Sequence, residues 1–561
     1  MSENKVTVFG KNAEERLEIL RDEKGNILLT DDQKRAVLER GRILVSASAG
    51  SGKTSTMVKR IIVMISEGTT LKNLLVLVYN NAAADELKEK LHQELFKAAC
   101  ASSGEKRDRF RQEIDELPFC HICTIHAFCQ SLIRENFDKL GISPTFDVLD
   151  ETRHASYMNR ALDDVIATYT ASGDETFCEL ADIFSQSRKE ENLKSNLIKF
   201  YGLIEIQPDK EEFEKCVSEC YDSYENSKFF AILQDYYKTF FANAKNALLP
   251  IKTQLEVLAP TSKYLQSLAV AICFCDEIES KSRLFDMCTL ASKYEKPRAT
   301  VSPKASDEEK LLVGYVKDYL KQFHDAIDEM KEICNRQDSL ESAHEQNAKY
   351  VKKLVEVAQT FAKKLEELKQ EDNVLSFEDL QHKALELLSH DEYELSGDFD
   401  AVFVDEYQDV NPTQEAIIRK LVKGECFMVG DVKQSIYGFR LADPAIFISR
   451  QNAYEESVKE GTNVYFNRNF RSAYGILDFV NGVFDSAMTK ASADVDYKKD
   501  ARFELKDVAP VKLEGVSPEG YVQVHLFVKQ KSESVPSFGL YDIEKDEGEE
   551  DDEASSQEGN F

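Results

Sequence analysis

The sequence predicts an α/β protein, in which a parallel-sheet domain carries a large all-helical insertion and is followed by the start of a second α/β domain. Short and almost continuously apolar segments, typical of strands buried on both faces, alternate with helical patterns in the first and last thirds of the chain. Residues 150–370 show long helical patterns only. This alternation is typical of sheets with helices on both faces.

The chain has 561 residues, a net charge of −30, 42% hydrophobic residues and 31% charged residues. This length is too great for one hydrophobic core, so we expect three or four domain-sized units. The acidity argues against a bulk, sequence-blind attraction to nucleic acid, but it is compatible with a local basic groove.

Twelve cysteines are scattered without a disulfide-like framework, and no signal peptide or long apolar run is visible. We therefore expect a reducing, cytoplasmic location and no membrane association. Cys120 and Cys123 lie close to His126 and Cys129. This group has the residue types of a metal cluster, but buried thiols in a strand and a helix also explain it, and we favour the second interpretation.

The N-terminal residues 1–28 are polar, with a short helix expected from Ala13 to Arg21. A capped helix follows, for which Thr30 or Asp31 can accept hydrogen bonds from free N–H groups. Gln33 in this helix is either a surface residue or a reader of a nucleobase. Its place shortly before the next motif favours the base contact.

Residues 43–56, ILVSASAGSGKTST, have the layout of a phosphate-binding loop. An apolar strand ends abruptly in small residues, which allow backbone N–H groups to approach phosphate oxygens, and a helix opens behind them. Lys53 is expected to reach the β- and γ-phosphates and Thr54 to ligate Mg²⁺. The first glycine of the usual pattern is replaced by Ala47, and a plain turn is the alternative. The expected binding residues are Ala47, Ser48, Ala49, Gly50, Ser51, Gly52, Lys53, Thr54 and Ser55.

Further strands are expected at residues 74–79 and 122–124, with a helix from Ala82 to Leu91 between them. From residue 150 to 370, apolar residues keep helical spacing, so we expect packed or coiled helices. The two clearest series are Leu312, Val316, Tyr319 and Phe323, and Val351, Leu354, Ala358, Phe361, Leu365 and Leu368. Aromatic pairs such as Phe229-Phe230 and Tyr236-Tyr237 could line a nucleic-acid path, but core packing is the better interpretation.

The apolar segment 400–405, DAVFVD, ends in adjacent acids. Asp405 is placed to hold Mg²⁺, and Glu406 is placed to act as a base toward an attacking water. A surface pair of acids is the alternative, which the upstream phosphate loop disfavours.

A strand at residues 426–429 leads into GDVKQSIYGFR, so this segment should lie along the same carboxyl edge of the sheet. Gln434 could sense the γ-phosphate. Tyr437 and Phe439 can stack on bases while Arg440 meets the backbone. Arg471, in the sequence NFRS, could reach the γ-phosphate across a cleft as an arginine finger does.

Strand candidates at residues 464–466 and 521–528 suggest that another α/β unit begins near residue 455. The acidic, low-complexity end of the chain is expected to be disordered.

Taken together, these motifs resemble the UvrD/Rep-like superfamily 1 helicases, and in particular their AddA-like branch. LTDDQKRAV is similar to the Q motif, SASAGSGKT to motif I, VYNNAAADEL to motif Ia and TIHAFC to the following single-strand motif. VDEYQD is similar to motif II, VGDVKQSIYGFRLADP to motif III and NRNFRS to motif IV. The resemblance runs from about residue 28 to 530.

The resemblance implies an ATP- and Mg²⁺-dependent DNA helicase, moving 3′ to 5′ in double-strand break repair and recombination, with an AddB-like partner subunit. It implies that Gln33 contacts adenine, that Lys53, Glu406, Gln434 and Arg471 serve catalysis, and that Thr54 and Asp405 serve the metal. The residues implied to face DNA are Tyr79, Asn81, Thr124, His126, Tyr437, Phe439 and Arg440. The implied domains are a first RecA-like domain in two parts (1–149 and 371–454), the helical insertion (150–370), the beginning of a second RecA-like domain (455–530) and the acidic tail (531–561).

Two departures from the family pattern are visible. Motif Ia has Val78-Tyr79-Asn80-Asn81 where the family usually reads TFTN, which puts its hydroxyl contacts to DNA in doubt. The sequence also stops before motifs V and VI and before a nuclease domain, so we expect the isolated chain to be impaired as a helicase. The alternatives are a nucleotide- and DNA-binding module, or a scaffold for a partner.

Overall fold

The computed structural model describes residues 13–22, 24–184, 190–224, 227–303, 305–390, 399–457, 459–489 and 497–505. These residues form two compact units, one built from the chain up to Val217 and from Tyr350 onward, the other from Ser218–Lys349. The strand expected at residues 521–528 and the acidic tail at 531–561 lie outside the described residues. The domain boundaries given above stay predictions.

The first unit contains a six-stranded sheet with the order β3-β2-β6-β7-β1-β8 within the described chain. Its strands are β1 (Arg42–Ala47), β2 (Leu74–Val78), β3 (His121–Thr124), β6 (Ala401–Val404), β7 (Glu425–Gly430) and β8 (Thr462–Phe466). All neighbouring strands are parallel. The predicted parallel sheet is therefore confirmed, and the carboxyl ends of β1, β6 and β7 share one edge.

Strand β8 lies elsewhere than the sequence suggested. We expected residues 464–466 to begin a separate α/β unit, but β8 pairs with β1 from Ile43↔Thr462 to Ala47↔Phe466. The physical reason is that β1, paired with β7 on one side, has a second hydrogen-bonding edge to satisfy. The segment that follows β8 is thereby carried to the end of β1, where the phosphate loop begins.

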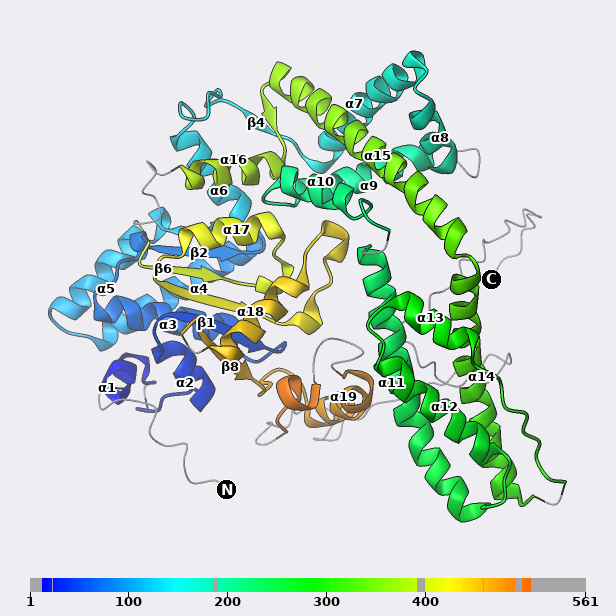
Figure 1. The fold of residues 1–561 in the computed structure, drawn as a ribbon. Coiled ribbons are helices and arrows are strands. Elements are labelled where there is room, and N and C mark those ends of the chain that lie inside the picture. The colour runs from blue at the N-terminus through cyan, green and yellow to red at the C-terminus, as the bar shows by residue number, and fades with distance from the viewer. Residues whose placement is uncertain are drawn as a thin grey trace, which may run out of the picture. The chain divides into compact units, whose positions relative to one another are not determined.

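Alternate residues of the strands enter two cores on opposite faces of the sheet. Figure 1 shows helices on both faces of this sheet. One core contains Val45, Val76 and Phe403, and the other contains Leu44 and Leu77. The first is covered by α3 (Lys53–Glu67), α4 (Asn81–Ala101) and α5 (Glu105–Glu116). The second is covered by α6 (Ile125–Glu135), α16 (Phe377–Ser389), α17 (Pro412–Leu421) and α18 (Pro444–Glu456).

Further elements of the first unit are α1 (Ala13–Leu17), η1 (Glu18–Leu20), α2 (Asp31–Leu38), η2 (Leu71–Asn73), η3 (Leu117–Phe119), η5 (Tyr407–Asp409), η6 (Val432–Gln434), η7 (Gly438–Arg440), α19 (Tyr474–Ala487) and η8 (Tyr497–Ala501).

Helix α2 begins with a full capping box. The Thr30 hydroxyl accepts from the backbone N–H of Gln33, and the Gln33 side chain accepts from Thr30 N. The predicted cap at Thr30 is confirmed.

Four helices pack around one small core in the first unit, beyond the sheet. They are α7 (Glu151–Ser172), α8 (Glu175–Phe184), α9 (Glu190–Glu205) and the later part of α15 (Gln337–Glu371), and α10 (Lys210–Glu219) follows α9. Phe361, Leu365 and Leu368 of the predicted apolar series lie in this core. The two-stranded pair β4 (Asp147–Val148) and β5 (Val374–Leu375) lies where the chain leaves the sheet domain and returns to it.

The second unit is helical in its described part. Its helices are α11 (Lys228–Leu258), α12 (Tyr264–Glu279), α13 (Leu284–Ser292), α14 (Asp307–Asn335) and the first turns of α15. The rings of Phe241, Phe274 and Phe323 meet edge to face, with centroids 5.3–5.8 Å apart. Tyr237 belongs to the same core, as expected, whereas Phe229 is 43% exposed.

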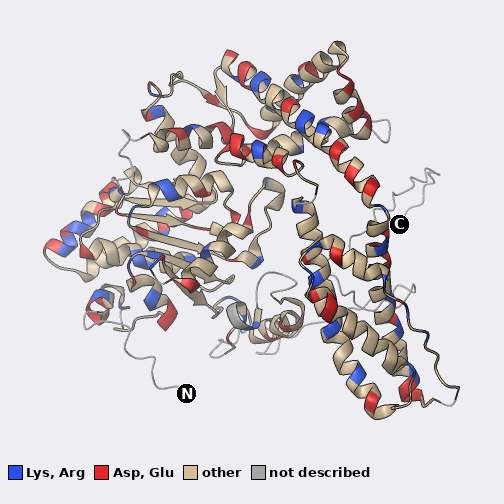
Figure 2. Ribbon diagram, viewed as in Figure 1, with Lys and Arg blue, Asp and Glu red and all other residues tan. Residues whose placement is uncertain are grey.

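The charged residues follow the layers of the fold. In Figure 2, acidic and basic residues are interspersed along the helices, whereas the strands of the sheet are mostly uncharged. In the part of the chain that the structure describes, no helix combines the length and apolarity needed to cross a membrane.

Candidate nucleotide site and adjoining cavity

The phosphate loop connects β1 to α3. Gly50 and Gly52 have φ values of +72° and +86°, a left-handed conformation that side chains disfavour. Ser51 closes the turn, since its N–H and its hydroxyl both donate to the carbonyl of Ser48. Helix α3 then begins at Lys53, so its first N–H groups, including those of Thr54 and Ser55, face the loop end of the sheet.

The lysine of the loop contacts an acid from another strand end. Lys53 Nζ lies 3.0 and 3.2 Å from the two carboxylate oxygens of Glu406. Glu406 itself has a φ of +49°, an uncommon conformation for a residue other than glycine. The structure thus brings together the predicted phosphate-binding lysine and the predicted base.

Asp405 lies beside this pair at the end of β6. Its backbone N–H donates to Leu77 O, and its carboxylate accepts the N–H of Glu406 at 3.0 Å. Burial, and next the neighbouring charge of Glu406, raise the pKa of Asp405 to about 6. A cation at this carboxylate would offset both effects, so Asp405 fits the predicted metal ligand.

Gln408 is a site residue that the sequence analysis missed. Its side-chain NH₂ donates to Glu406 (3.0 Å) and to Asp409 (2.9 Å), and its carbonyl accepts the N–H of Asp431 (2.8 Å). Gln408 is almost fully buried, and a Cβ on Gly430 would lie 2.5 Å from its oxygen. It joins the end of β6 to the end of β7. Its position inside the VDEYQD motif could have identified Gln408 as a site residue from the sequence.

The buried carboxylate of Asp431 organises the segment after β7. It accepts from Lys433 Nζ at 2.5 Å and from the Gln434 side-chain amide at 2.6 Å. The predicted γ-phosphate sensor Gln434 therefore lies on the same sheet edge as Lys53 and Glu406, and its side chain is held there by Asp431.

The turn after β8 sits directly on the phosphate loop. Asn469 donates through Nδ2 to Ala49 O (2.7 Å), and the N–H of Phe470 donates to Gly50 O (2.8 Å). A Cβ on Gly50 would lie 2.7 Å from the Cβ of Arg471. The structure thus places Arg471 beside the loop. Asn469, which the sequence analysis did not single out, holds this turn by also accepting the N–H of Arg471.

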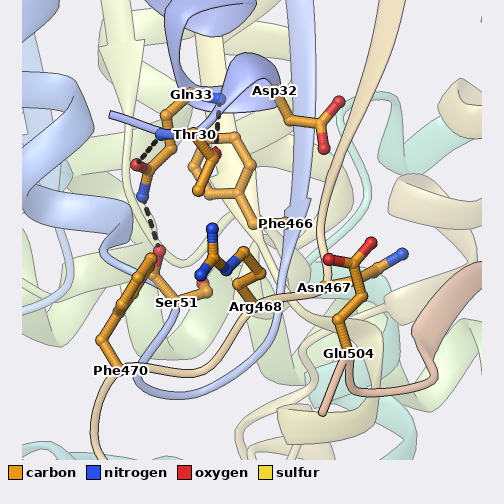
Figure 3. Close-up of a pocket in the computed structure, with 9 residues that line it drawn as sticks. All are labelled: Thr30, Asp32, Gln33, Ser51, Phe466, Asn467, Arg468, Phe470 and Glu504. Atoms are coloured by element: carbon orange, nitrogen blue, oxygen red, sulfur yellow. Dashed lines mark hydrogen bonds between the residues drawn. The ribbon is translucent and has the colours of Figure 1, made fainter. Parts of the chain in front are cut away.

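A narrow pocket opens next to the loop (Figure 3). Gln33 lines it and donates to Ser51 O at 3.0 Å. Arg468 points from the opposite wall toward Thr30 and Ser51, with its guanidinium 5.7 Å from the centre of the Phe470 ring. The pocket is lined by Thr30, Asp32, Gln33, Ser51, Phe466, Asn467, Arg468, Phe470 and Glu504.

A separate cavity of about 540 Å³ gathers four residues that were predicted to face DNA: Tyr79, His126, Tyr437 and Phe439. The rings of Tyr79 and Tyr437 stack with centroids 4.8 Å apart, and that of Phe439 lies 5.7 Å from Tyr437. The His126 ring packs on Phe377, 4.8 Å away.

The other predicted DNA residues are placed differently. The Thr124 hydroxyl caps α6 by accepting the N–H of Ala127. Asn81 is the exposed first residue of α4. The Arg440 side chain lies outside the part that the structure describes.

The cysteine group near His126 contains neutral thiols. Burial raises the pKa of Cys123 to about 11 and that of the buried Cys129 further. Among the described residues, no set of three potential ligands is arranged to hold a metal ion. Cys129 is buried, whereas Cys120 and Cys123 are partly buried.

The fold and the site define a phosphate-loop α/β protein, with the loop lysine paired to an acid at the end of a neighbouring parallel strand. Comparison with known families carries the assignment further. A family model described as the UvrD/REP helicase N-terminal domain matches residues 29–455. The chain belongs to this family.

Several curated relatives are named as a subunit of an ATP-dependent helicase/nuclease. The chain is 30% identical over 513 residues to the relative from Enterococcus faecalis, covering 85% of this chain and 40% of the relative. It is 31% identical over 509 residues to the relative from Bacillus velezensis, covering 85% and 41%. The chain thus spans about 40% of the length of these relatives. The predicted resemblance to the AddA-like branch is confirmed.

Proposed function

We propose that this chain is the motor portion of an ATP-dependent DNA helicase of the AddA-like type. In this proposal it couples ATP hydrolysis to 3′ to 5′ movement along single-stranded DNA, in double-strand break repair and recombination, together with an AddB-like partner. The names of the relatives support a DNA substrate and a multi-subunit assembly. The observation that carries the proposal is the contact of Lys53 with Glu406 at the shared edge of the sheet.

The site residues take distinct roles. The phosphate loop and the first N–H groups of α3 bind the phosphates, and Lys53 exchanges the carboxylate of Glu406 for a phosphate oxygen. Glu406, released from Lys53, is then free to orient the attacking water and to accept its proton. Arg471, beside Gly50, reaches the γ-phosphate.

Thr54 and Asp405 would hold Mg²⁺, which supplies charge neutralisation for the phosphates when it is bound. Gln33, at the pocket of Figure 3, contacts the adenine. Tyr79, Tyr437 and Phe439 offer ring faces on which unpaired bases stack. Each of these assignments follows the family resemblance and the placement described above.

Steady-state ATPase assays with and without single-stranded DNA test the proposal, together with binding of a fluorescent ATP analogue. We expect DNA-stimulated turnover that falls by about 100-fold or more in Lys53→Ala and Glu406→Gln, because each removes a group acting on the γ-phosphate or the water. Glu406→Gln should retain nucleotide binding. Lys72→Ala, which removes an exposed partner of Glu116, is the matched control.

Other outcomes distinguish the alternatives. Tight nucleotide binding without DNA stimulation would favour a binding module. If the chain binds no nucleotide, both the motor proposal and the binding module are contradicted, and a scaffold for a partner is the remaining alternative.

A further inference from the structure

Three polar side chains, two of them buried and one partly buried, are linked by hydrogen bonds along the wall of the 540 Å³ cavity. His126 Nε2, near the start of α6, lies 2.9 Å from the side-chain nitrogen of Gln381 on α16. The Gln381 carbonyl accepts from Asn411 Nδ2 at 3.2 Å. Gln381 is 4% exposed and Asn411 is 9% exposed. All three residues line the cavity. Gln381 lies outside every motif that carries the family resemblance.

The donor and the acceptor of each of these side-chain hydrogen bonds follow from the contact that Asn411 makes. Asn411 is the N-cap of α17, and its carbonyl accepts the backbone N–H of Gln414 at 2.8 Å. A backbone N–H can only donate, so the NH₂ of Asn411 must be the group that faces Gln381. The carbonyl of Gln381 therefore faces Asn411, and its NH₂ faces His126.

This polarity determines the protonation of the histidine. Since the Gln381 NH₂ group donates, Nε2 of His126 must accept, and an imidazole nitrogen accepts only when it carries no hydrogen. The ring is then neutral, with its proton on Nδ1. A doubly protonated ring would place an N–H opposite the NH₂ of Gln381.

We propose that Gln381 is a positioning residue that holds His126 as the neutral Nδ1–H tautomer, so that His126 meets single-stranded DNA as a hydrogen-bond donor through Nδ1. The acceptors that fit such a donor are phosphate oxygens and base carbonyls. The DNA contact rests on the proposed function, whereas the tautomer does not.

The groups around His126 have opposing effects on its protonation, so a hydrogen bond from Gln381 can decide the tautomer. The charged or titratable groups that line the cavity beside it are Glu378 from α16, Asp150, Glu151 and His154 at the start of α7, Glu205 from α9, and Asp409 after β6. The phenol groups of Tyr79, Tyr201 and Tyr437 also line the cavity. The carboxylates favour a protonated histidine, and burial opposes it. Burial has the larger effect and lowers the pKa of His126, while Glu378 raises it.

Two variants of Gln381 act on the tautomer in opposite ways. Gln381→Met removes both hydrogen bonds, so either nitrogen of His126 can carry the proton. Gln381→Glu still accepts from Asn411 but places an acceptor opposite Nε2, which favours a proton there and a cationic ring. Gln370→Met, at an exposed glutamine of α15, is the control for loss of a glutamine side chain.

Nitrogen-15 NMR of the full chain with labelled histidine tests the tautomer directly, with His126→Asn assigning the signal. At pH 7 we expect a protonated Nδ1 and a bare Nε2 in the wild-type protein, and a protonated Nε2 in Gln381→Glu. A protonated Nε2 in the wild-type protein would overturn the proposal. The wild-type measurement requires neither DNA binding nor a folded variant at position 381.

Fluorescence anisotropy with a labelled oligothymidine tests the DNA contact. We expect Gln381→Met to bind DNA about 3-fold to 10-fold more weakly at pH 8, because one donor of modest strength is no longer oriented, with nucleotide affinity unchanged. Gln381→Glu should bind more tightly as the pH falls from 8 to 6, a dependence that the wild-type and Gln370→Met proteins lack.

The two measurements fail separately. Equal DNA affinity and equal pH profiles in all four proteins would overturn the role of Gln381 in DNA binding. A wild-type protein that binds no DNA would contradict the proposed function, and the NMR result would still decide the tautomer.

Discussion

At the scale of single residues, adjacent acids at one strand end have different tasks. Asp405 is enclosed and has a raised pKa, whereas Glu406 turns toward Lys53 in a left-handed conformation. Without a bound metal cation, the buried carboxylate of Asp405 lies beside the charge of Glu406, which Lys53 offsets only in part. Such an arrangement destabilises the unliganded protein, and a bound cation offsets this effect.

Asp405→Asn should therefore stabilise the protein in the absence of Mg²⁺ and nucleotide. The folded pKa of about 6 lies above the ordinary 3.8. The charged carboxylate consequently destabilises the fold fully above pH 6, and this effect disappears as the pH falls below 3.8. At pH 8 we expect a gain of about 3 kcal/mol in the free energy of unfolding, measured with urea, because the two pKa values differ by about two units and each unit corresponds to about 1.4 kcal/mol. The gain should vanish near pH 4.

Asp400→Asn is the matched control, because Asp400 precedes the other end of β6 and is exposed beside Asn73. Its substitution should leave the stability unchanged at both pH values. A destabilised Asp405→Asn at pH 8 would contradict the argument.

Gly50→Ala tests the contact between the phosphate loop and the turn after β8. The new Cβ would lie 2.7 Å from the Cβ of Arg471, which must move away. Gly41→Ala is the control, since Gly41 has a similar φ of +89° but no atom within 4 Å of the place that a Cβ would take. Both variants lose about 1 kcal/mol from the left-handed backbone. Only Gly50→Ala should also lose nucleotide affinity, measured by titration. Equal affinities would contradict a role for this contact.

At the scale of elements, a buried arginine joins α2 to α3. Arg60 Nη1 donates to the carbonyls of Ala36 (2.7 Å) and Glu39 (2.6 Å) at the end of α2, and Nη2 donates to Glu425 on β7 (3.0 Å). Helix α2 carries Gln33 at its other end. Arg60 thus fixes the helix from which Gln33 reaches the phosphate loop.

Arg60→Met should lower the free energy of unfolding by about 3 kcal/mol, because several buried carbonyls lose their donor at once. Chemical denaturation measures this loss. Arg35→Met, which removes only a side-chain pair with Glu39, should cost less than about 1 kcal/mol. Equal losses in the two variants would show that Arg60 is not the main support of α2.

At the scale of the whole molecule, the two compact units have separate hydrophobic cores. Phe323 is fully buried in the helical unit and Phe403 is fully buried in the sheet. No core of described residues contains both side chains. Each unit should therefore respond separately to a cavity made in its own core.

Phe323→Ala and Phe403→Ala form a matched pair that tests this separation. Each should destabilise its own unit by about 3–5 kcal/mol through lost burial and a new cavity. Hydrogen exchange read by mass spectrometry should show faster exchange within residues 218–349 for Phe323→Ala, and within the strands for Phe403→Ala. Nucleotide binding should weaken only in Phe403→Ala. Faster exchange in both units for either variant would contradict separate cores.

The sequence by itself determined the strands of the sheet, the phosphate loop, the strand-end acids and the helical character of residues 150–370. These features depend on local patterns: apolar runs, small residues in a turn, and helical spacing. Tertiary structure alone decided that β8 is the neighbour of β1, that Gln408 joins two strand ends, and that Arg60 and Gln381 are buried donors. Strand order and hydrogen-bond partners depend on which segments, distant in sequence, come into contact, and local sequence patterns do not specify those contacts.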